Sequence, residues 1–335
     1  MKPLISVIIP VKNSERTIEK CLVSVTGQDY PDYEIIVVND GSTDNTGVIL
    51  EKFKKNAGVR IIETPGMGPS SARNMAMMSA KGEYVAFTDG DCIVDRDWLK
   101  ELLNAFSPAD ISAEEKNKIA GTGGAQLSPE DEVPFGRDVQ RFMEKVGFIT
   151  EYIKPGAGTG QAGSQGRAGQ TGSPRYRFVE HNPTCNAMYR KDIIERVGGF
   201  QKGLWPGEDV DLDYRIRKEG YLLVFNPSAM VYHYRTSSIK KFAAMMFNYG
   251  RVQTYLVKKY GFFRKIQYLP IITLLALGLI VFLLKWSPLA VLSSSALLLL
   301  GSIVYFGSFK TFYLGLVAGI FWNAGFVRGL INWES

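Results

Sequence analysis

Apolar and polar positions alternate between two patterns along the first 91 residues of the chain, one typical of strands and one typical of helices. Short apolar runs rich in β-branched residues recur, and each is followed by a segment whose apolar residues are spaced as on a helix. This pattern predicts strands at 5–9, 33–40, 59–64 and 83–91 and helices within 12–25, 41–55 and 68–82, the first capped by Ser14. Strands and helices in alternation are typical of an α/β fold with a mostly parallel sheet.

Residues at the ends of these strands are candidates for ligand binding. Pro10, Asp40 and the segment Asp89–Asp91 all stand at carboxyl ends of predicted strands. In parallel sheets these ends meet at one edge, where ligands bind, so we expect one crevice. The turn after the first strand contains no glycine, and Gly66–Gly68 follows only the third strand. The pattern therefore argues against a dinucleotide-binding dehydrogenase.

Asp89 and Asp91 are separated by a single residue, Gly90. On an extended chain their carboxylates would point to the same side and repel each other unless a positive group lay between them. A plain turn also favours these residue types. Because the two acids end an apolar strand, we favour a site that holds a positive charge.

Three long apolar runs lie near the C-terminus, at 266–284, 286–307 and 311–327. The first has 19 residues without a charge, enough to span about 28 Å as a helix. The first two runs are predicted to form a transmembrane hairpin, and the third to span the membrane or to be re-entrant, with Gly315 and Gly319 as a packing pair. Three such runs argue against a buried soluble hairpin.

The charge is unevenly distributed between the two parts of the chain. Residues 237–335 carry ten Lys or Arg and one acid, whereas residues 1–236 carry a net charge of −3. Basic residues mixed with Phe, Met and Tyr at 237–265 predict amphipathic helices at an anionic membrane surface, rather than a nucleic-acid partner. Seven of these basic residues precede the first span and predict a multi-pass protein of the cell membrane with a cytoplasmic catalytic domain.

Cysteine and glycine usage adds two expectations. The three cysteines, Cys21, Cys92 and Cys185, show no metal-type spacing and suit a reducing cytoplasm. The Gly-rich segment 155–174 cannot pack a core and predicts a flexible loop. We favour a lid on the acceptor side over an inert insertion.

Six segments in order resemble glycosyltransferase family 2: SVIIPVKNSERTIEKCLVSVTGQDY, IIVVNDGSTDNT, GPSSARNMA, FTDGDC, NAMYRKDIIERVGGF and GEDVDLDYRIRKEGY. The resemblance extends from about Leu4 to His233. It implies a GT-A type nucleotide-sugar-binding domain and inverting transfer from a nucleotide-sugar donor. The resulting domain division is 1–236 for catalysis, 237–265 for the membrane interface and 266–335 for the transmembrane region.

The resemblance also implies roles for residues near the donor. Pro10 lines the crevice, Asp40 and Asp89 contact the base or ribose, and Gly90 allows the ligand to approach closely. Arg73 and Asn74 would face the donor, although Arg73 could equally be a solvated helix arginine.

The resemblance further implies a divalent cation, Mn²⁺ or Mg²⁺. Asp91 would be a ligand between protein and diphosphate. His233 lies 24 residues after Asp209 and would add an imidazole, which favours Mn²⁺. A purely structural His233 is the alternative.

The acidic segment 208–213 would hold the base of the reaction. By resemblance Asp209 takes the proton of the acceptor hydroxyl and Glu208 orients the acceptor. Acids also suit a helix N-terminus, but not four of them together. Arg215 and Arg217 either neutralise phosphate or, as we favour, pair with Asp211 and Asp213. His181 is structural or lies on the acceptor side.

The expected partners are a UDP- or GDP-sugar donor, a lipid-linked or glycolipid acceptor, and membrane lipids. No Gln-x-x-Arg-Trp motif follows the acidic segment, which argues against a processive polymer synthase. A polyprenyl-phosphate acceptor, a sugar nucleotidyltransferase and a non-catalytic membrane scaffold are the alternatives. The first would need no base, the second normally has a Gly-rich first loop, and the third would not turn over donor.

Overall fold

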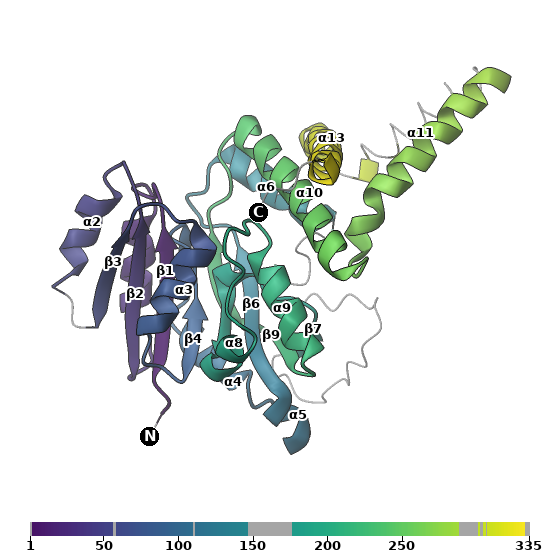
Figure 1. Ribbon diagram of the computed structural model, residues 1–335. Coiled ribbons are helices and arrows are strands. Elements are labelled where there is room, and N and C mark those ends of the chain that lie inside the picture. The colour runs from purple at the N-terminus through teal and green to yellow at the C-terminus, as the bar shows by residue number, and fades with distance from the viewer. Residues whose placement is uncertain are drawn as a thin grey trace. The chain divides into compact units, whose positions relative to one another are not determined.

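The computed structural model describes residues 2–55, 58–109, 111–146, 176–287, 301, 304–305 and 307–331 (Figure 1). Contacts divide the chain into two compact units. The first comprises Met1–Asp131 and Ile149–Tyr234, and the second comprises Glu132–Phe148 and Arg235–Ser335. The Gly-rich segment 155–174 and most of the apolar run 286–307 lie outside the described residues.

The predicted parallel strands form one half of the sheet in the first unit. They are β1 (Ile5–Val11), β2 (Tyr33–Asp40), β3 (Val59–Thr64) and β4 (Tyr84–Phe87), in the order β3-β2-β1-β4 and all parallel. Val7 and Ile9 pack into one core cluster and Ile8 into another, so both faces of β1 are buried. The carboxyl ends of β1, β2 and β4 therefore meet at one edge, as predicted.

The other half of the sheet was not predicted and makes the sheet mixed rather than mostly parallel. It consists of β8 (Ala187–Arg190), β6 (Ile119–Leu127), β9 (Leu222–His233) and β5 (Cys92–Val94), with β7 (Arg177–Val179) also on β9. β8 is antiparallel to β4 and β6, and β9 is antiparallel to β5 and β7. Only β6 and β9 are parallel among these pairs. The parallel arrangement thus holds for β1 to β4 and for the pair of β6 with β9.

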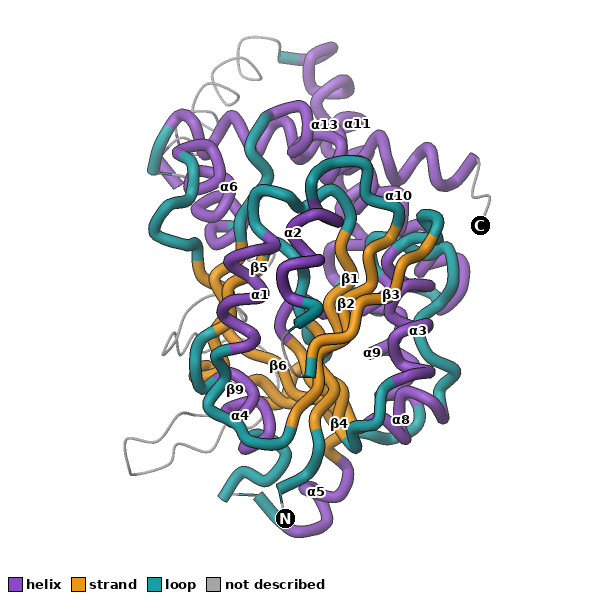
Figure 2. Tube along the Cα trace, turned by 90° about the vertical axis from the view of Figure 1, so that its left-hand side faces the viewer, coloured by secondary structure: helices purple, strands orange, loops and turns teal. Residues whose placement is uncertain are grey.

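Helices cover both faces of this sheet (Figure 2). On one face lie α1 (Ile18–Thr26), α2 (Thr46–Phe53) and α4 (Trp98–Asn104), which bury residues in the core cluster of Val7. On the other lie α3 (Pro69–Ser79), α8 (Lys191–Arg196) and α9 (Glu208–Lys218), which bury residues around Ile8. The short elements α5 (Ala113–Lys118) and η1 (Thr184–Asn186) complete the unit.

The predicted cap of the first helix is wrong by three residues. The N-cap is Thr17, and the backbone carbonyl of Ser14, not its side chain, accepts hydrogen bonds from the amides of Thr17 and Ile18. A tight turn at 15–17 thus precedes α1, and the chain between β1 and α1 is longer than the pattern suggested.

The second unit is helical. It contains α6 (Pro134–Lys145), α10 (Ile239–Tyr260), η2 (Lys265–Tyr268), α11 (Leu269–Trp286) and α13 (Phe309–Ile331). Two helical segments, Lys265–Trp286 and Phe309–Ile331, are long and apolar enough to cross a membrane, by length and composition only.

Glycines set the distance between α10 and α13. A Cβ at Gly325 would lie 1.9 Å from the carbonyl oxygen of Phe247, and one at Gly250 would lie 1.9 Å from that of Trp322. By contrast, a Cβ at Gly319 would meet no described atom within 4 Å. The helices approach each other at Gly325 and Gly329, which are four residues apart, as are Gly315 and Gly319 in the predicted packing pair. The structure thus assigns close packing to the later pair and not to Gly319.

Candidate functional site

Asp40 ends β2 and organises the loop before α3. Its Oδ1 accepts hydrogen bonds from the Thr64 hydroxyl and the Met67 amide, both at 2.7 Å, and its Oδ2 accepts one from the Gly68 amide at 2.8 Å. Burial opposes ionisation, but these donors and Lys12 outweigh it and lower the pKa of Asp40. Asp40 is therefore an ionised, nearly buried anchor at the expected edge, and its contact with a donor stays a prediction.

Arg73 lies between two carboxylates that come from opposite ends of the site. Its Nη2 donates to Asp89 Oδ1 at 2.8 Å and its Nη1 donates to Glu208 Oε1 at 2.6 Å. The side chain is 3% exposed and packs over the Phe200 ring. Although burial opposes its charge, Asp89 and Glu208 raise the pKa of Arg73. Arg73 is thus a buried bridge rather than a solvated helix arginine.

Glu208 is a buried carboxyl group with a raised pKa. Burial and the neighbouring Asp209 raise its pKa to about 7, although Arg73 acts in the opposite direction. The Arg73 bridge fixes this carboxyl group at the first residue of α9. Its contact with an acceptor stays a prediction.

Asp91 and His233 lie together, as the predicted metal site requires. His233 Nε2 is 3.4 Å from Asp91 Oδ1, and the side chains are 18% and 46% exposed. Asp89 and Asp91 have different neighbours, because Asp89 pairs with Arg73 and Asp91 lies beside His233. The cation expected beside them stays a prediction.

Two cysteines lie beside this pair, which the sequence did not predict. Ligand atoms of Cys92, Cys185 and His233 are all within 4.8 Å of one another. The hydrogen bond with Cys92 and, after it, His233 lower the pKa of the Cys185 thiol to about 6, while burial and the same contact raise the pKa of Cys92.

Gly90 and Pro10 have steric roles in the structure. A Cβ at Gly90 would lie 2.7 Å from Val11 Cγ1 and 3.3 Å from Ser14 Oγ, so this position requires glycine because the loop packs against the end of β1. Pro10 is buried in β1 beside Val38 of β2. Both lie at the expected edge, and their contacts with a donor stay predictions.

Asn74 is held by the backbone of Phe200. Its Nδ2 donates to the Phe200 carbonyl at 2.8 Å and its Oδ1 accepts from the Phe200 amide at 2.9 Å. These bonds join α3 to the turn after α8. They account for Asn74 without a ligand, so its donor contact also stays a prediction.

The acids of α9 have distinct partners. Asp211 pairs with Arg215 at 2.8 Å, as we predicted. The expected pair of Asp213 with Arg217 is wrong, because Arg217 reaches Glu180 and Asp213 is fully buried. Glu208 and Asp211 thus have arginine partners, whereas the ion-pair neighbour of both Asp209 and Asp213 among the described residues is His181.

Asp213 instead fixes a histidine beside Asp209. His181 Nδ1 lies 2.8 Å from Asp213 Oδ2, and its Nε2 lies 3.8 Å from Asp209 Oδ2. Asp213 also accepts from the Asn182 amide at 2.7 Å and from the Tyr189 hydroxyl at 2.8 Å. The hydrogen bond to Asp213 fixes the ring orientation. The sequence predicts His181 only as structural or on the acceptor side, because its partner Asp213 is 32 residues away.

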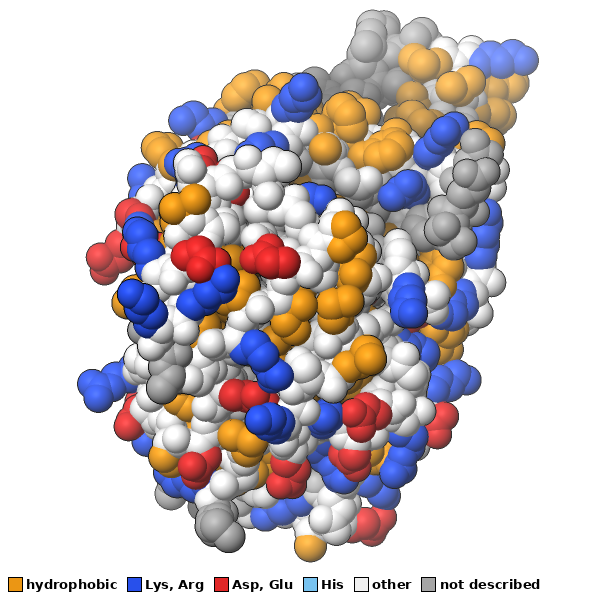
Figure 3. Space-filling model, turned by 60° about the vertical axis from the view of Figure 1, so that its left-hand side comes forward, with side chains coloured by type: hydrophobic (Ala, Val, Ile, Leu, Met, Phe, Trp, Pro, Cys, Tyr) orange, Lys and Arg blue, Asp and Glu red, His pale blue; other side chains and the backbone are white. Residues whose placement is uncertain are grey.

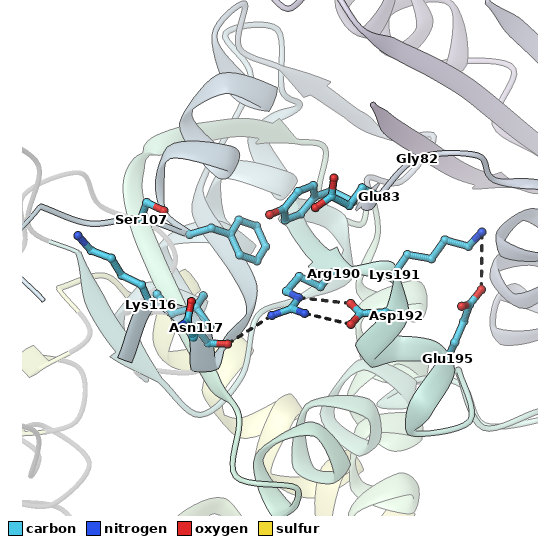
Figure 4. Close-up of a pocket in the computed structure, with 12 residues that line it drawn as sticks. Gly82, Glu83, Ser107, Lys116, Asn117, Arg190, Lys191, Asp192 and Glu195 are labelled. Atoms are coloured by element: carbon cyan, nitrogen blue, oxygen red, sulfur yellow. Dashed lines mark hydrogen bonds and ion pairs between the residues drawn. The ribbon is translucent and has the colours of Figure 1, made fainter. Parts of the chain in front are cut away.

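A cavity of about 610 Å³ lies at the opposite edge of the sheet (Figure 4). It is lined at the start of β4 and β6 and the end of β8, where Arg190 pairs with Asp192 and Lys191 with Glu195. Arg190 and Lys191 are thus engaged by neighbouring acids, and the predicted residues lie elsewhere. On the face seen in Figure 3, acidic and basic side chains are interspersed over the lower part of the molecule, unlike the continuous basic surface typical of nucleic-acid binding.

Comparison with known proteins gives consistent results along the chain. Residues 6–113 match the model described as Glycosyl transferase family 2, and residues 177–321 match the one described as Glycosyl transferase family group 2. Glycosyltransferase AglE from Haloferax volcanii is 31% identical over 228 residues. That alignment covers 67% of this chain and 64% of AglE, so the chain spans less than two thirds of this relative.

A second relative and a solved structure extend the comparison. The Methanococcus voltae relative is named dolichyl N-acetyl-alpha-D-glucosaminyl phosphate 3-beta-D-2,3-diacetamido-2,3-dideoxy-beta-D-glucuronosyltransferase; it is 24% identical over 292 residues, 83% of each chain. The mannosyltransferase PcManGT from Pyrobaculum calidifontis, solved with GDP-Man and Mn²⁺, has a TM-score of 0.68 at 18% identity and covers 100% of this chain and 89% of its own. The fold is therefore the mixed α/β fold of GT-A enzymes.

Proposed function

The chain belongs to glycosyltransferase family 2, and we propose that it transfers a sugar, with inversion, from a nucleotide-sugar donor to a hydroxyl of a lipid-linked acceptor. The observation that carries this proposal is the Arg73 bridge. It joins Asp89, beside the candidate metal residues, to Glu208, beside the candidate base Asp209. One buried guanidinium would therefore hold the proposed donor and acceptor sides of the site at a fixed separation.

The donor would lie along the carboxyl edge of β1, β2 and β4. Asp40 and Asp89 would contact the base or ribose, and Pro10, Gly90, Arg73 and Asn74 would line the site or hold it in shape. A UDP- or GDP-sugar is the proposed donor, and the GDP-Man complex of PcManGT supports a nucleotide sugar in this fold.

Asp91 and His233 suit a divalent cation. Their separation of 3.4 Å is about that of two ligands of one ion, and the half-exposed carboxylate leaves room for phosphate or water. When bound, Mn²⁺ or Mg²⁺ would stabilise the charge on the leaving diphosphate.

Asp209 would take the proton from the acceptor hydroxyl. Its Oδ1 accepts a hydrogen bond from the Val210 amide at 2.8 Å, which orients the carboxylate at the start of α9. Glu208, held by Arg73, would orient the acceptor, and His181 lies close enough to help position Asp209. A polyprenyl phosphate acceptor would already be anionic, so it would make Asp209 dispensable.

The helices of the second unit support a lipid-linked acceptor at the cytoplasmic face of the cell membrane. We propose that α11, α13 and the run 286–307 anchor the chain in several passes, with α10 at the membrane surface. The Methanococcus voltae relative, whose name includes a dolichyl phosphate sugar, supports an acceptor of this class.

Nucleotide release with purified protein, Mn²⁺, membrane lipid extract and a panel of UDP- and GDP-sugars tests this proposal. We expect release from one donor and its loss in Asp91→Ala and Asp209→Asn. Asp192→Asn is the matched control, because this half-exposed acid lines the cavity at the opposite edge.

Each other outcome has a defined meaning. If Asp209→Asn stays fully active while Asp91→Ala fails, the acceptor is a lipid phosphate and the base assignment is wrong. If no donor is turned over, the chain is a scaffold that retains the fold. If the activity survives Asp91→Ala and chelation, the metal assignment is wrong.

A further inference from the structure

The cluster of Cys92, Cys185 and His233 is built by the pairing of the sheet. Cys92 of β5 is directly opposite His233 of β9 in an antiparallel pair, so the two side chains lie on the same face. Cys185 belongs to η1, whose position is fixed by a hydrogen bond of 3.0 Å from the Thr88 hydroxyl to the Cys185 carbonyl. Three sequence-distant side chains are thus brought together by rigid elements.

The proposed transfer reaction gives the two thiols no role. A cation that bridges Asp91 and a diphosphate needs oxygen ligands, and one imidazole is sufficient as an addition. Yet Cys92 is fully buried and Cys185 is 5% exposed, with their sulfur atoms directed at the same histidine. Sulfur and imidazole together are the ligand set of zinc-class cations.

The distances are compatible with one ion. Ligands of a tetrahedral zinc ion lie about 3.3 to 3.8 Å apart. Ligand atoms of the three residues are within 4.8 Å of one another. Asp91 Oδ1 lies 4.0 Å from Cys92 Sγ and 3.4 Å from His233 Nε2, so this carboxylate can complete the set. The cluster within 4.8 Å does not include Asp91, so its carboxylate would have to move toward Cys185 to join the same ion.

We propose that Cys92, Cys185 and His233, with Asp91 as the fourth ligand, form a binding site for a thiophilic divalent cation of the zinc class. Binding forms two metal–thiolate bonds and releases to solvent the protons that the two thiols still carry, so affinity rises with pH until both thiols are ionised. The site shares Asp91 and His233 with the proposed Mn²⁺ or Mg²⁺ site. The two cations therefore compete, a consequence that rests on the proposed function.

Cobalt spectroscopy of the reduced full-length protein tests binding without any donor or acceptor. We expect one equivalent of Co²⁺ to produce thiolate-to-cobalt charge-transfer absorption, and Zn²⁺ to displace it because N/S sites prefer Zn²⁺ to Co²⁺ when thiolates contribute. Full reactivity of all three thiols toward Ellman's reagent in excess Zn²⁺, with no cobalt absorption, would overturn the proposal.

Cysteine variants identify the ligands. Cys185→Ser and Cys92→Ala should each weaken Zn²⁺ binding on the order of 100-fold. Cys21→Ala is the matched control, because Cys21 is also a buried thiol but is not in the cluster, and it should keep the absorption. Equal absorption in Cys185→Ser and wild type overturns the assignment. If a variant fails to fold, X-ray absorption of the wild-type zinc complex counts the sulfur ligands directly.

Competition is measured separately from binding. In the nucleotide-release assay, Zn²⁺ should inhibit wild type and Cys21→Ala more strongly than Cys185→Ser, and added Mn²⁺ should relieve the inhibition. Binding of Zn²⁺ with unchanged Mn²⁺-dependent turnover would refute the shared ligands. Absence of any turnover would concern the proposed function alone and leave the spectroscopic result intact.

Discussion

Arg73 Nη1 lies 2.6 Å from Glu208 Oε1, and both side chains are almost completely buried, at 3% and 5% exposure. The same guanidinium also reaches Asp89. A planar fork can serve two carboxylates at once, whereas an ammonium group cannot match that geometry. Through its two ion pairs, Arg73 of α3 therefore joins the loop after β4 to the first turn of α9.

Arg73→Lys should reduce both stability and nucleotide release. Breaking a buried pair of this kind costs about 3–5 kcal/mol, because a carboxylate is left buried without its partner. Urea denaturation measures the loss. Arg60→Lys is the control, since Arg60 pairs with Glu34 near the surface and its replacement should cost less than about 1 kcal/mol. Equal losses in the two variants would show that burial of Arg73 is unimportant.

Glu208 should make stability depend on pH in a defined direction. Its pKa in the folded chain is about 7, above the ordinary value of 4.5, so folding favours the protonated form. The stabilisation from this group is complete below about pH 4.5 and is lost as the pH rises through about 7. In Glu208→Gln this decline should be absent when unfolding free energies are measured across that range. Parallel pH profiles for variant and wild type would contradict the shift.

The Asp213–His181 pair should act through Asp209. Asp213→Asn and His181→Gln should lower kcat by roughly 10- to 100-fold and alter its pH profile, because Asp209 loses a fixed neighbour. Tyr189→Phe removes a different hydrogen bond from Asp213 and should cost far less. A change in KM alone, with kcat and the pH profile kept, would assign His181 to acceptor binding only.

Gly90→Ala should destabilise the first unit by about 1–3 kcal/mol through overpacking. The new methyl group would lie 2.7 Å from Val11 Cγ1. Thermal unfolding of Gly90→Ala, Val11→Ala and the double variant tests this, because the second substitution should recover part of the loss. Gly47→Ala is the control, since its Cβ would have only an ordinary contact at 3.6 Å.

Gly325→Ala should loosen the packing of α13 on α10, whereas Gly319→Ala should not. The first Cβ would overlap the Phe247 carbonyl and the second meets no described atom nearby. Trp322 is buried and stacks on Phe326, so its fluorescence should shift on exposure in detergent. Identical spectra for the two variants would argue against the close approach.

Local periodicity predicted the first half of the sheet well. The strands expected at 33–40 and 59–64 have those bounds in the structure. Each could be predicted because the apolar residues that form a strand are consecutive in the sequence. The antiparallel half depends on pairings such as Gly121 with Tyr189, which are remote in sequence. No local period indicates such partners.

The site shows the same division. The positions of Asp40, Asp89 and Asp91 at one edge follow from strand ends, whereas the burial of Arg73 depends on Glu208, 135 residues away. Cys92 and Cys185 have no motif spacing and meet only through β5, β9 and η1. The pairing of Asp213 with His181 was missed because helix spacing favoured Arg217.

The pairing of β5 with β9 also limits how this site can change by insertion or deletion. β5 has only three residues, and Cys92 faces His233 across the pair. A one-residue slip would turn Cys92 to the other face of the sheet and carry Asp91 away from His233. Length changes in this short segment would therefore disrupt both proposed cation sites together.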